Sequence, residues 1–260
     1  MDRVDIGLAG VILTLVLLAI RTPIGVTLGL IAFLGISALT SIRSAWSILT
    51  SIPHSFITDW NLSAVPMFLL MGYLCAQAGL TSGLFKAVRS FSGRLPGGLA
   101  STTVLASALF SSASGSSVAT AAAFSKIAIP EMRKAGYDDG LAVGSVAASG
   151  TLGSLIPPSV LLILFGIFTN TPIGVLFVAG ILPGILSALA YITMITARAY
   201  LNPNLAPHNE VSYSSEEKRQ LFRDLWPFPT LVLSVMVGIF TGIFSPTEAG
   251  AIGSSIALAI

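Results

Sequence analysis

The chain has 260 residues, of which 54% are hydrophobic and only 9% are charged, and its net charge is +2. Soluble domains carry roughly 25% charged residues, and a soluble domain of this size cannot remove so much apolar surface from water. The composition therefore excludes a soluble enzyme, a nucleic-acid-binding protein and a disordered chain, and it indicates an all-α polytopic membrane protein. One cysteine and two distant histidines form no cluster with metal-ligand spacing.

Apolar runs predict the membrane segments in chain order. A helix needs about 20 apolar residues to span a bilayer, or about 17 at the shortest. The runs cover residues 6–20, 24–42, 62–79, 99–125, 140–169, 173–197 and 229–244, and a further run begins at 249. Because acids outnumber bases in residues 1–5, we expect the first run to be a retained helix rather than a cleaved signal peptide.

The basic residues set the orientation and require one re-entrant segment. One ordinary span between Arg94 and Lys126 would place two basic clusters on opposite sides of the membrane, against the positive-inside rule. A helical hairpin that enters and leaves from the cytoplasmic side removes this conflict, with two half-length helices of about 12–14 residues each. Its tip is predicted at residues 111–117, and every Lys and Arg except Arg3 and Arg43 then becomes cytoplasmic.

The predicted hairpin consists mostly of small residues. Ala, Ser, Thr and Gly make up 20 of the 26 residues in Ala100–Ser125, whereas a lipid-facing helix would carry Leu, Ile and Phe. The segment is therefore predicted to be buried in protein. An unwound turn around Gly115 would expose carbonyl and hydroxyl oxygens suited to Na⁺, and half-helix N-termini suit a carboxylate. The alternative is that the serines bond to helix carbonyls and the small residues only pack.

A second interruption is predicted within Ala148–Val160. Gly150, Gly153 and the pair Pro157-Pro158 interrupt a long apolar stretch, and consecutive prolines break a helix. A broken helix that faces a small-residue hairpin is the arrangement of a secondary-transporter site. A plain proline-kinked span is the alternative.

Between these two features, Lys126–Gly140 predicts a short helix that begins at Pro130 and ends at Gly136. Asp138 or Asp139 is predicted to cap the helix that follows.

Two helix starts are predicted near the end of the chain. Residues Glu216–Trp226 have the pattern of a short amphipathic helix at a membrane surface. Ser245 and Glu248 have the spacing of a capping box, with Pro246 at the first helical position. A role of Glu248 in gating or partner contact is the alternative.

Together these segments resemble the large membrane subunit of the TRAP (tripartite ATP-independent periplasmic) transporters, the DctM-like family. The matching residues are Ser114–Gly166, LFVAGILPGILSAL and SPTEAGAIG. The resemblance implies a Na⁺-coupled, elevator-type importer in the bacterial cytoplasmic (inner) membrane, and no enzyme. The implied partners are a small membrane subunit, a periplasmic solute-binding protein, the lipid bilayer and a small organic anion such as a dicarboxylate or sugar acid; nucleic acid is not among them.

The resemblance also implies where the ligands bind. Na⁺, the coupling ion, is expected where the hairpin tip meets the broken helix, and the substrate is expected beside it. The implied ion-binding residues are Ser114, Gly115, Ser116, Gly150, Thr151, Gly153 and Ser154, and the implied substrate-binding residues are Ser112, Ser117 and Pro157.

The expected organisation is the first part of an inverted-repeat fold, with about six transmembrane spans besides the re-entrant hairpin and the broken helix. The expected divisions are scaffold-like spans at 1–98, hairpin and broken helix at 99–170, a return span at 171–200, a cytoplasmic loop with a short helix at 201–227, and a span with the start of the second half at 228–260. Family members carry a second, inverted half that these residues lack, so we do not expect this chain alone to transport.

Two alternatives remain at this point. One is a binding-protein-independent carrier of the dicarboxylate or citrate type. The other is a non-transporting structural membrane protein, which would be favoured if Ala100–Ser125 formed one continuous lipid-facing helix. The sequence offers no nucleophile–base pair, metal cluster or phosphate loop that would indicate an enzyme.

Overall fold

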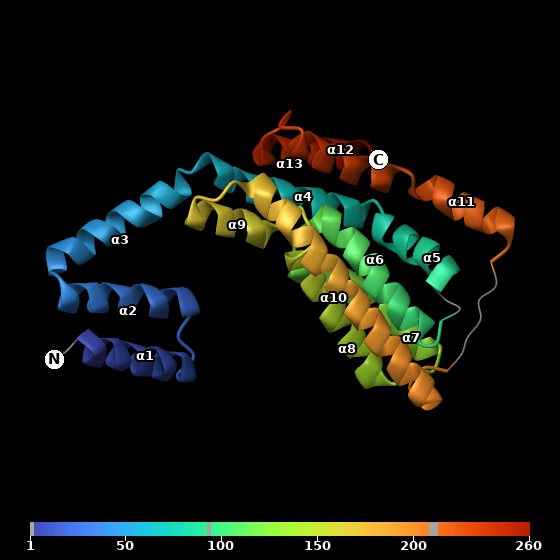
Figure 1. Ribbon diagram of the computed structural model, residues 1–260, viewed down its shortest axis with the longest axis horizontal. Helices are drawn as coiled ribbons and strands as arrows, with labels where there is room; N and C mark the ends of the chain where they lie inside the picture. Colours follow the sequence, from blue (N-terminus) through green and yellow to red (C-terminus); the bar gives the residue numbers. More distant parts are fainter. Residues whose placement is uncertain (1–2, 93–94, 208–212) are drawn as a thin grey trace. The chain divides into compact units, whose positions relative to one another are not determined.

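The computed structural model describes residues 3–92, 95–207 and 213–260, and over these residues it contains α-helices and short 3₁₀ segments but no strand (Figure 1). The predicted all-α class is therefore confirmed. The chain divides by packing into two compact units, residues 1–59 and residues 60–260. The functional divisions predicted from the sequence have other boundaries than these two units, and they stay predictions.

Three helices make up the first unit: α1 (Arg3–Ala19), α2 (Ile24–Leu39) and α3 (Ile42–Ile57). Helix α2 contacts both of the others, and the rings of Phe33 and Trp46 meet edge to face at 5.2 Å between α2 and α3. Helix α3 lies almost wholly between the predicted apolar runs 24–42 and 62–79, and it was not predicted. Ser41 explains where this helix begins, because its hydroxyl accepts a hydrogen bond from the Ser44 N–H.

The second unit is built around one small-residue helix. Its helices, in chain order, are α4 (Ala64–Gln77), α5 (Leu80–Ser92), α6 (Gly98–Ser114), α7 (Ser117–Lys134), α8 (Asp139–Gly150), α9 (Val160–Thr169), α10 (Ile173–Leu201), α11 (Ser215–Leu225), α12 (Pro227–Phe240) and α13 (Pro246–Ala259). All residues of α6 except Leu105 and Leu109 are buried, against α4, α5, α7, α8 and α10. The prediction that Ala100–Ser125 is buried within protein is confirmed for α6, and α10 lies alongside that helix (Figure 1). The α7 part of the segment is only partly buried, and Val118 is 78% exposed.

Small residues also bring α13 against α4. A Cβ atom at Gly250 would lie 2.9 Å from the Cβ of Met67, and Gly253 lies directly against Met71. The Ser254 hydroxyl donates to the Met67 carbonyl at 2.8 Å. The predicted start of α13 is confirmed, because Ser245 and Glu248 form the capping box and Pro246 is the first helical residue.

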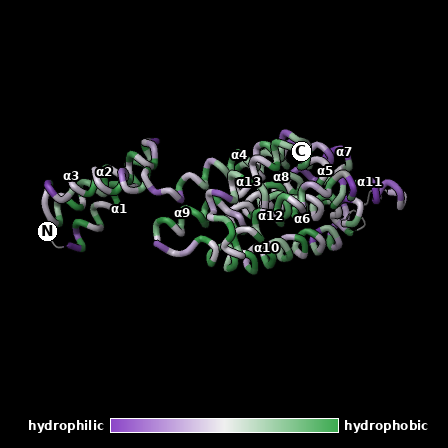
Figure 2. The backbone as a smooth tube through the Cα atoms, turned by 90° about the horizontal axis from the view of Figure 1, so that it is seen from above, coloured by the Kyte–Doolittle hydropathy of each residue, from purple (hydrophilic) through white to green (hydrophobic). Residues whose placement is uncertain are grey.

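The predicted amphipathic helix is α11, and Figure 2 shows that it is strongly hydrophilic. It packs on α5, where the rings of Phe91 and Phe222 meet edge to face at 5.1 Å. A capping box of Ser214 and Glu217 starts the helix, and this second box was not predicted.

Among the described helices, α10 alone is long and apolar enough to cross a membrane by itself. The number rises to three if two bent helix pairs each count as one span. One of these pairs joins residues 60–77 to α5 with a bend of 67°. The six spans predicted from the sequence therefore stay a prediction.

The segment Lys126–Gly140 corrects one expectation. No new helix begins at Pro130; instead α7 continues through this proline to Lys134. Lys126 and Pro130 are both exposed residues, and near a surface other donors can satisfy a carbonyl that loses its amide partner. The two hairpin helices are accordingly longer than expected, with 17 residues in α6 and 18 in α7. The predicted stop at Gly136 and the cap at Asp138, which accepts from the Leu141 N–H, are confirmed.

Helices α6 and α7 form an antiparallel hairpin. They are joined at Gly115 and Ser116, and their open ends meet where the Leu99 N–H donates to the Tyr137 hydroxyl at 3.2 Å. The structure thus rules out one continuous helix through Ala100–Ser125, which removes the argument for a purely structural protein. Burial raises the pKa of Tyr137, and the Leu99 N–H and the Arg89 charge lower it by less, so the phenol stays neutral near neutral pH.

Replacing Tyr137 with Phe tests the closure of the hairpin base. The change leaves the buried Leu99 N–H without its acceptor, so the free energy of unfolding should fall by about 1–3 kcal/mol. Unfolding of the purified protein in detergent measures the effect. Tyr200→Phe is the matched control, because Tyr200 is 76% exposed, and it should change little. Equal stability of the two variants would contradict a role for this hydrogen bond.

Candidate functional site

The hairpin tip is a two-residue break between long helices. Gly115 ends α6 in the left-handed conformation, with φ of 59°, and its N–H donates to the Ser111 carbonyl at 2.9 Å. Glycine adopts this conformation without the strain of a side chain. Ser116 is extended, and its hydroxyl accepts from the Ala119 N–H at 3.3 Å to cap α7. The tip predicted at residues 111–117 is confirmed.

The predicted break in the second helix is also confirmed. Helix α8 ends at Gly150, a 3₁₀ turn covers Thr151–Ser154, and α9 begins at Val160. Pro157 and Pro158 lie in the non-helical stretch between them. The Ser159 hydroxyl is buried and donates to the Ser154 carbonyl at 2.8 Å, so it satisfies one of the backbone groups that the break leaves without a helical partner.

The tip and the break meet backbone to backbone. The first amide of α9, Val160 N–H, donates to the Gly115 carbonyl at 3.0 Å. A Cβ atom at Gly115 would lie 2.7 Å from the Pro158 carbonyl oxygen, and one at Gly153 would lie 2.7 Å from the Ser116 carbonyl. Both distances are shorter than real Cβ contacts, so only glycine permits this approach at either position.

Helix α4 holds the other side of the tip. A Cβ atom at Gly72 would lie 2.6 Å from the Cα of Ser114, which shows that the two backbones touch. Inside the hairpin, the rings of Phe110 and Phe124 pack edge to face at 5.9 Å. The tip is therefore held from three directions: by α4, by the break and by its own aromatic pair.

The polar groups at the tip are oxygens. The hydroxyls of Ser114 and Thr120 lie 2.8 Å apart across the turn, and both residues are buried. The last carbonyls of α6, from Ser112 to Ser114, have no amide one helical turn further on. Neutral oxygens of this kind are ligands of hard monovalent cations. Among the described residues no group of three His, Cys, Asp or Glu could hold a metal ion.

The hydroxyls of three predicted ligand-binding residues already form hydrogen bonds within the protein. Thr151 is exposed and bonds to the Ala148 carbonyl at 2.6 Å and to the Tyr191 hydroxyl of α10 at 3.2 Å. Ser154 donates to the Thr151 carbonyl at 2.7 Å, and Ser112 donates to the Leu109 carbonyl within its own helix.

The other predicted residues meet at the contact itself. Ser114, Gly115 and Ser116 form the tip, and Gly153 lies against it. Ser117 and Gly150 are close neighbours, because a Cβ atom at Gly150 would lie 3.4 Å from the Ser117 carbonyl. Pro157 is buried in the break. The ligand roles assigned to all these residues stay predictions.

Thr120 is the residue that sequence reasoning missed. It lies within the matching stretch Ser114–Gly166, but a residue six positions from Ser114 gives no local signal of contact until the chain reverses at Gly115. The same holds for Ser107 and Ser149, whose hydroxyls are 3.1 Å apart between α6 and α8. Such pairs join segments that are distant in sequence, and small-residue composition alone cannot assign them.

Gly153→Ala tests the close approach of the tip and the break. The added methyl group would overlap the Ser116 backbone, so the unfolding free energy should fall by about 1–3 kcal/mol. Gly144→Ala in α8 is the matched control, since nothing lies within 4 Å of its added Cβ atom. The control should gain about 0.5–1 kcal/mol from the lower helix cost of alanine. Unfolding in detergent measures both, and equal effects would argue against the tight contact.

The sequence is similar to known membrane transport proteins. The family described as "Tripartite ATP-independent periplasmic transporter, DctM component" matches residues 11–260. The chain is 39% identical over 208 residues to the sialic acid TRAP transporter large permease protein SiaM of Vibrio cholerae, covering 78% of this chain and 47% of the relative. It is 36% identical over 197 residues to the C4-dicarboxylate TRAP transporter large permease protein DctM of Pseudomonas aeruginosa, covering 75% and 45%.

The sialic acid TRAP transporter permease protein SiaT of Haemophilus influenzae is 31% identical over 266 residues, covering 100% of this chain and 42% of the relative. The chain thus spans about half the length of these relatives, which are transport proteins rather than enzymes. The match over nearly all of the chain, with the hairpin and the broken helix inside it, shows that the chain belongs to the DctM family of tripartite ATP-independent periplasmic transporters.

Proposed function

We propose that this chain supplies the hairpin and broken-helix part of a Na⁺-coupled, binding-protein-dependent importer of a small organic anion. The observation that carries the proposal is the bond from Val160 N–H to the Gly115 carbonyl, which joins the re-entrant tip to the broken helix. An interrupted backbone of this kind is tolerated at membrane depth only in protein or beside a polar cavity. Transporters use such places for ions and substrates.

Na⁺ is proposed to bind at the oxygens of the tip. The candidates are the hydroxyls of Ser114 and Thr120 and the last carbonyls of α6, which face no amide of their own helix. A helix C-terminus carries partial negative charge, so a cation is favoured there. Binding would draw the tip and the break together, because both contribute backbone to the same small volume.

The anion is proposed to bind next to this site. Helix α7 begins at Ser117 and α9 begins at Val160, and both N-termini lie at the contact between tip and break. Helix N-termini carry partial positive charge, which suits a carboxylate. Sialic acid and C4-dicarboxylates, named for two of the relatives, are both organic acids.

The proposed movement is that of an elevator in the inner membrane. Helix α6 is enclosed by α4, α5, α7, α8 and α10, so the hairpin is expected to move with these neighbours as one body rather than flex alone. A small membrane subunit and a periplasmic solute-binding protein are the proposed partners. Uptake that persists without any periplasmic binding protein would instead support the binding-protein-independent carrier.

Thr120→Val in the full-length transporter tests the ion site. The substitution keeps the side-chain shape and removes one buried oxygen. Loss of one ligand worth about 1.4 kcal/mol should raise the half-saturating Na⁺ concentration for uptake about tenfold. Ser125→Ala is the control, because the Ser125 hydroxyl bonds only to the Ala122 carbonyl within α7. An unchanged Na⁺ dependence in Thr120→Val would remove Thr120 from the site.

Cysteine labelling tests the re-entrant topology. Leu95→Cys and Lys134→Cys lie near the two open ends of the hairpin and are exposed, whereas the native Cys75 is buried. Because both ends should face the cytoplasm, an impermeant maleimide should modify both variants in inside-out vesicles and neither in spheroplasts. Thr169→Cys, at the last residue of α9, should show the opposite pattern. Labelling of Leu95→Cys and Lys134→Cys from opposite sides would contradict the hairpin.

A further inference from the structure

A recess of about 660 Å³ is lined by residues of α4, α5, α6 and α7, and Gly72 and Ala119 extend its wall to the hairpin tip. Its volume falls in the range of about 300–1,000 Å³ typical of small-molecule sites. The walls are largely apolar and include Leu69, Phe110 and Ile127. The polar side chains that line it include those of Tyr73, Gln77, Thr81 and Lys126.

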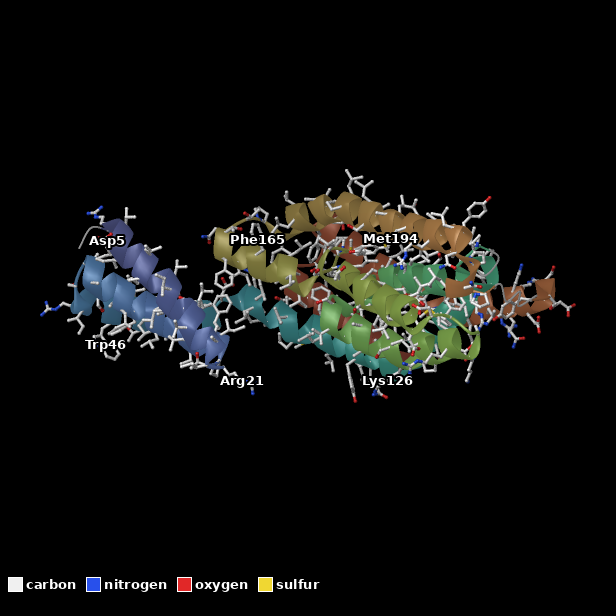
Figure 3. The ribbon with its side chains drawn as sticks, turned by 90° about the horizontal axis from the view of Figure 1, so that it is seen from below. Asp5, Arg21, Trp46, Lys126, Phe165 and Met194 are labelled. Atoms are coloured by element: carbon white, nitrogen blue, oxygen red, sulfur yellow. The ribbon has the colours of Figure 1, made fainter. Side chains whose placement is uncertain are left out.

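Lys126 gives the recess a single positive charge. It is an exposed residue of α7, and Figure 3 shows it at the margin of the second unit. Among the described residues it forms no ion pair, and no acidic side chain lines the recess. The acid of the same helix, Glu131, is already paired with Arg89 at 2.9 Å and with Lys134 at 3.7 Å.

Thr81 adds an unsatisfied polar group. The residue is 3% exposed, and its hydroxyl has no hydrogen-bond partner among the described residues. Buried hydroxyl groups in folded proteins nearly always have a partner, and an unpaired one is costly. Thr81 lines the recess, and its hydroxyl oxygen is itself buried, so a rotation of the side chain about χ1 brings the hydroxyl to a ligand oxygen in the recess.

The charge of Lys126, the neutral polar groups and the apolar walls together favour one kind of ligand. One positive charge and neutral hydrogen-bonding groups match one negative charge and hydroxyls, while Leu69, Phe110 and Ile127 match a hydrocarbon chain. A dicarboxylate would leave its second charge against these apolar walls, which is unfavourable. The exposed ring of Tyr73 is typical of a membrane–water boundary, where amphiphiles reside.

We propose that this recess binds a monoanionic phospholipid such as phosphatidylglycerol. Its phosphodiester pairs with Lys126, its glycerol hydroxyls bond to Thr81 and Gln77, and an acyl chain lies along Leu69, Phe110 and Ile127. The lipid would then bridge α4 and α5 to the hairpin helix α7. This proposal does not depend on the identity of the transported solute or on Na⁺ coupling.

Native mass spectrometry of the full-length transporter tests the proposal. The protein is exchanged into phosphatidylglycerol or phosphatidylcholine nanodiscs and released, and the retained lipid is counted. The wild type should retain one phosphatidylglycerol in preference to phosphatidylcholine. Lys126→Gln should reduce this preference about fivefold, the usual effect of one basic residue, and Lys126→Arg should keep it. Thr81→Val should weaken retention of phosphatidylglycerol without changing the charge.

Lys86→Gln is the matched control, because Lys86 is an exposed lysine of α5 that does not line the recess. An equal loss in Lys86→Gln, or full retention in Lys126→Gln, overturns the proposal. Displacement of the lipid by millimolar succinate also overturns it, in favour of a solute site. Ala122→Cys, which lines the recess, should react with N-ethylmaleimide after delipidation and be protected by phosphatidylglycerol. No reaction after delipidation would mean that another protein segment fills the recess.

Discussion

The second unit depends on a contact between two interrupted backbones. Gly115 and Gly153 let the hairpin tip and the broken helix touch, and the bond from Val160 N–H to the Gly115 carbonyl joins them. Each interruption exposes backbone groups that are costly to bury alone. Because each supplies partners for the other, two locally unfavourable segments become one stable arrangement. The same interruption leaves helix ends and free carbonyls in one place, which is why the functional proposal centres there.

The interior of the second unit contains hydrogen-bonded pairs of buried hydroxyl groups. Hydroxyl pairs join its helices: Ser92 with Thr102 at 2.6 Å, Ser107 with Ser149 at 3.1 Å, and Ser114 with Thr120 at 2.8 Å. In a membrane-protein family this is expected, since small residues permit close packing and their hydroxyls bond between helices. The serines therefore do pack and bond within the protein, as the simpler interpretation held, and the pair at the tip is in addition placed beside free carbonyls.

The hairpin has a second flank with different chemistry. The face of α7 near the break contributes backbone and small residues, whereas the face toward α4 and α5 carries Lys126 above an apolar recess. The neutral oxygens of the first face suit a desolvated cation, and the single ammonium of the second suits an anion at a membrane surface. A lipid on the second flank would affect the same helix whose N-terminus takes part in the proposed transport site.

Local sequence alone determined the all-α class, the tip at Gly115, the break after Gly150 and the capping box at Ser245, because glycine conformation, proline geometry and side-chain caps act within a few residues. It misplaced a helix start at Pro130, since whether a proline ends a helix depends on what surrounds the carbonyl it frees. Only the tertiary structure decided that Thr120 pairs with Ser114, that the Thr151 hydroxyl turns to Tyr191, and that Lys126 and Thr81 share a recess. These are contacts between residues on different helices, and the packing of whole helices, rather than any local pattern, selects them.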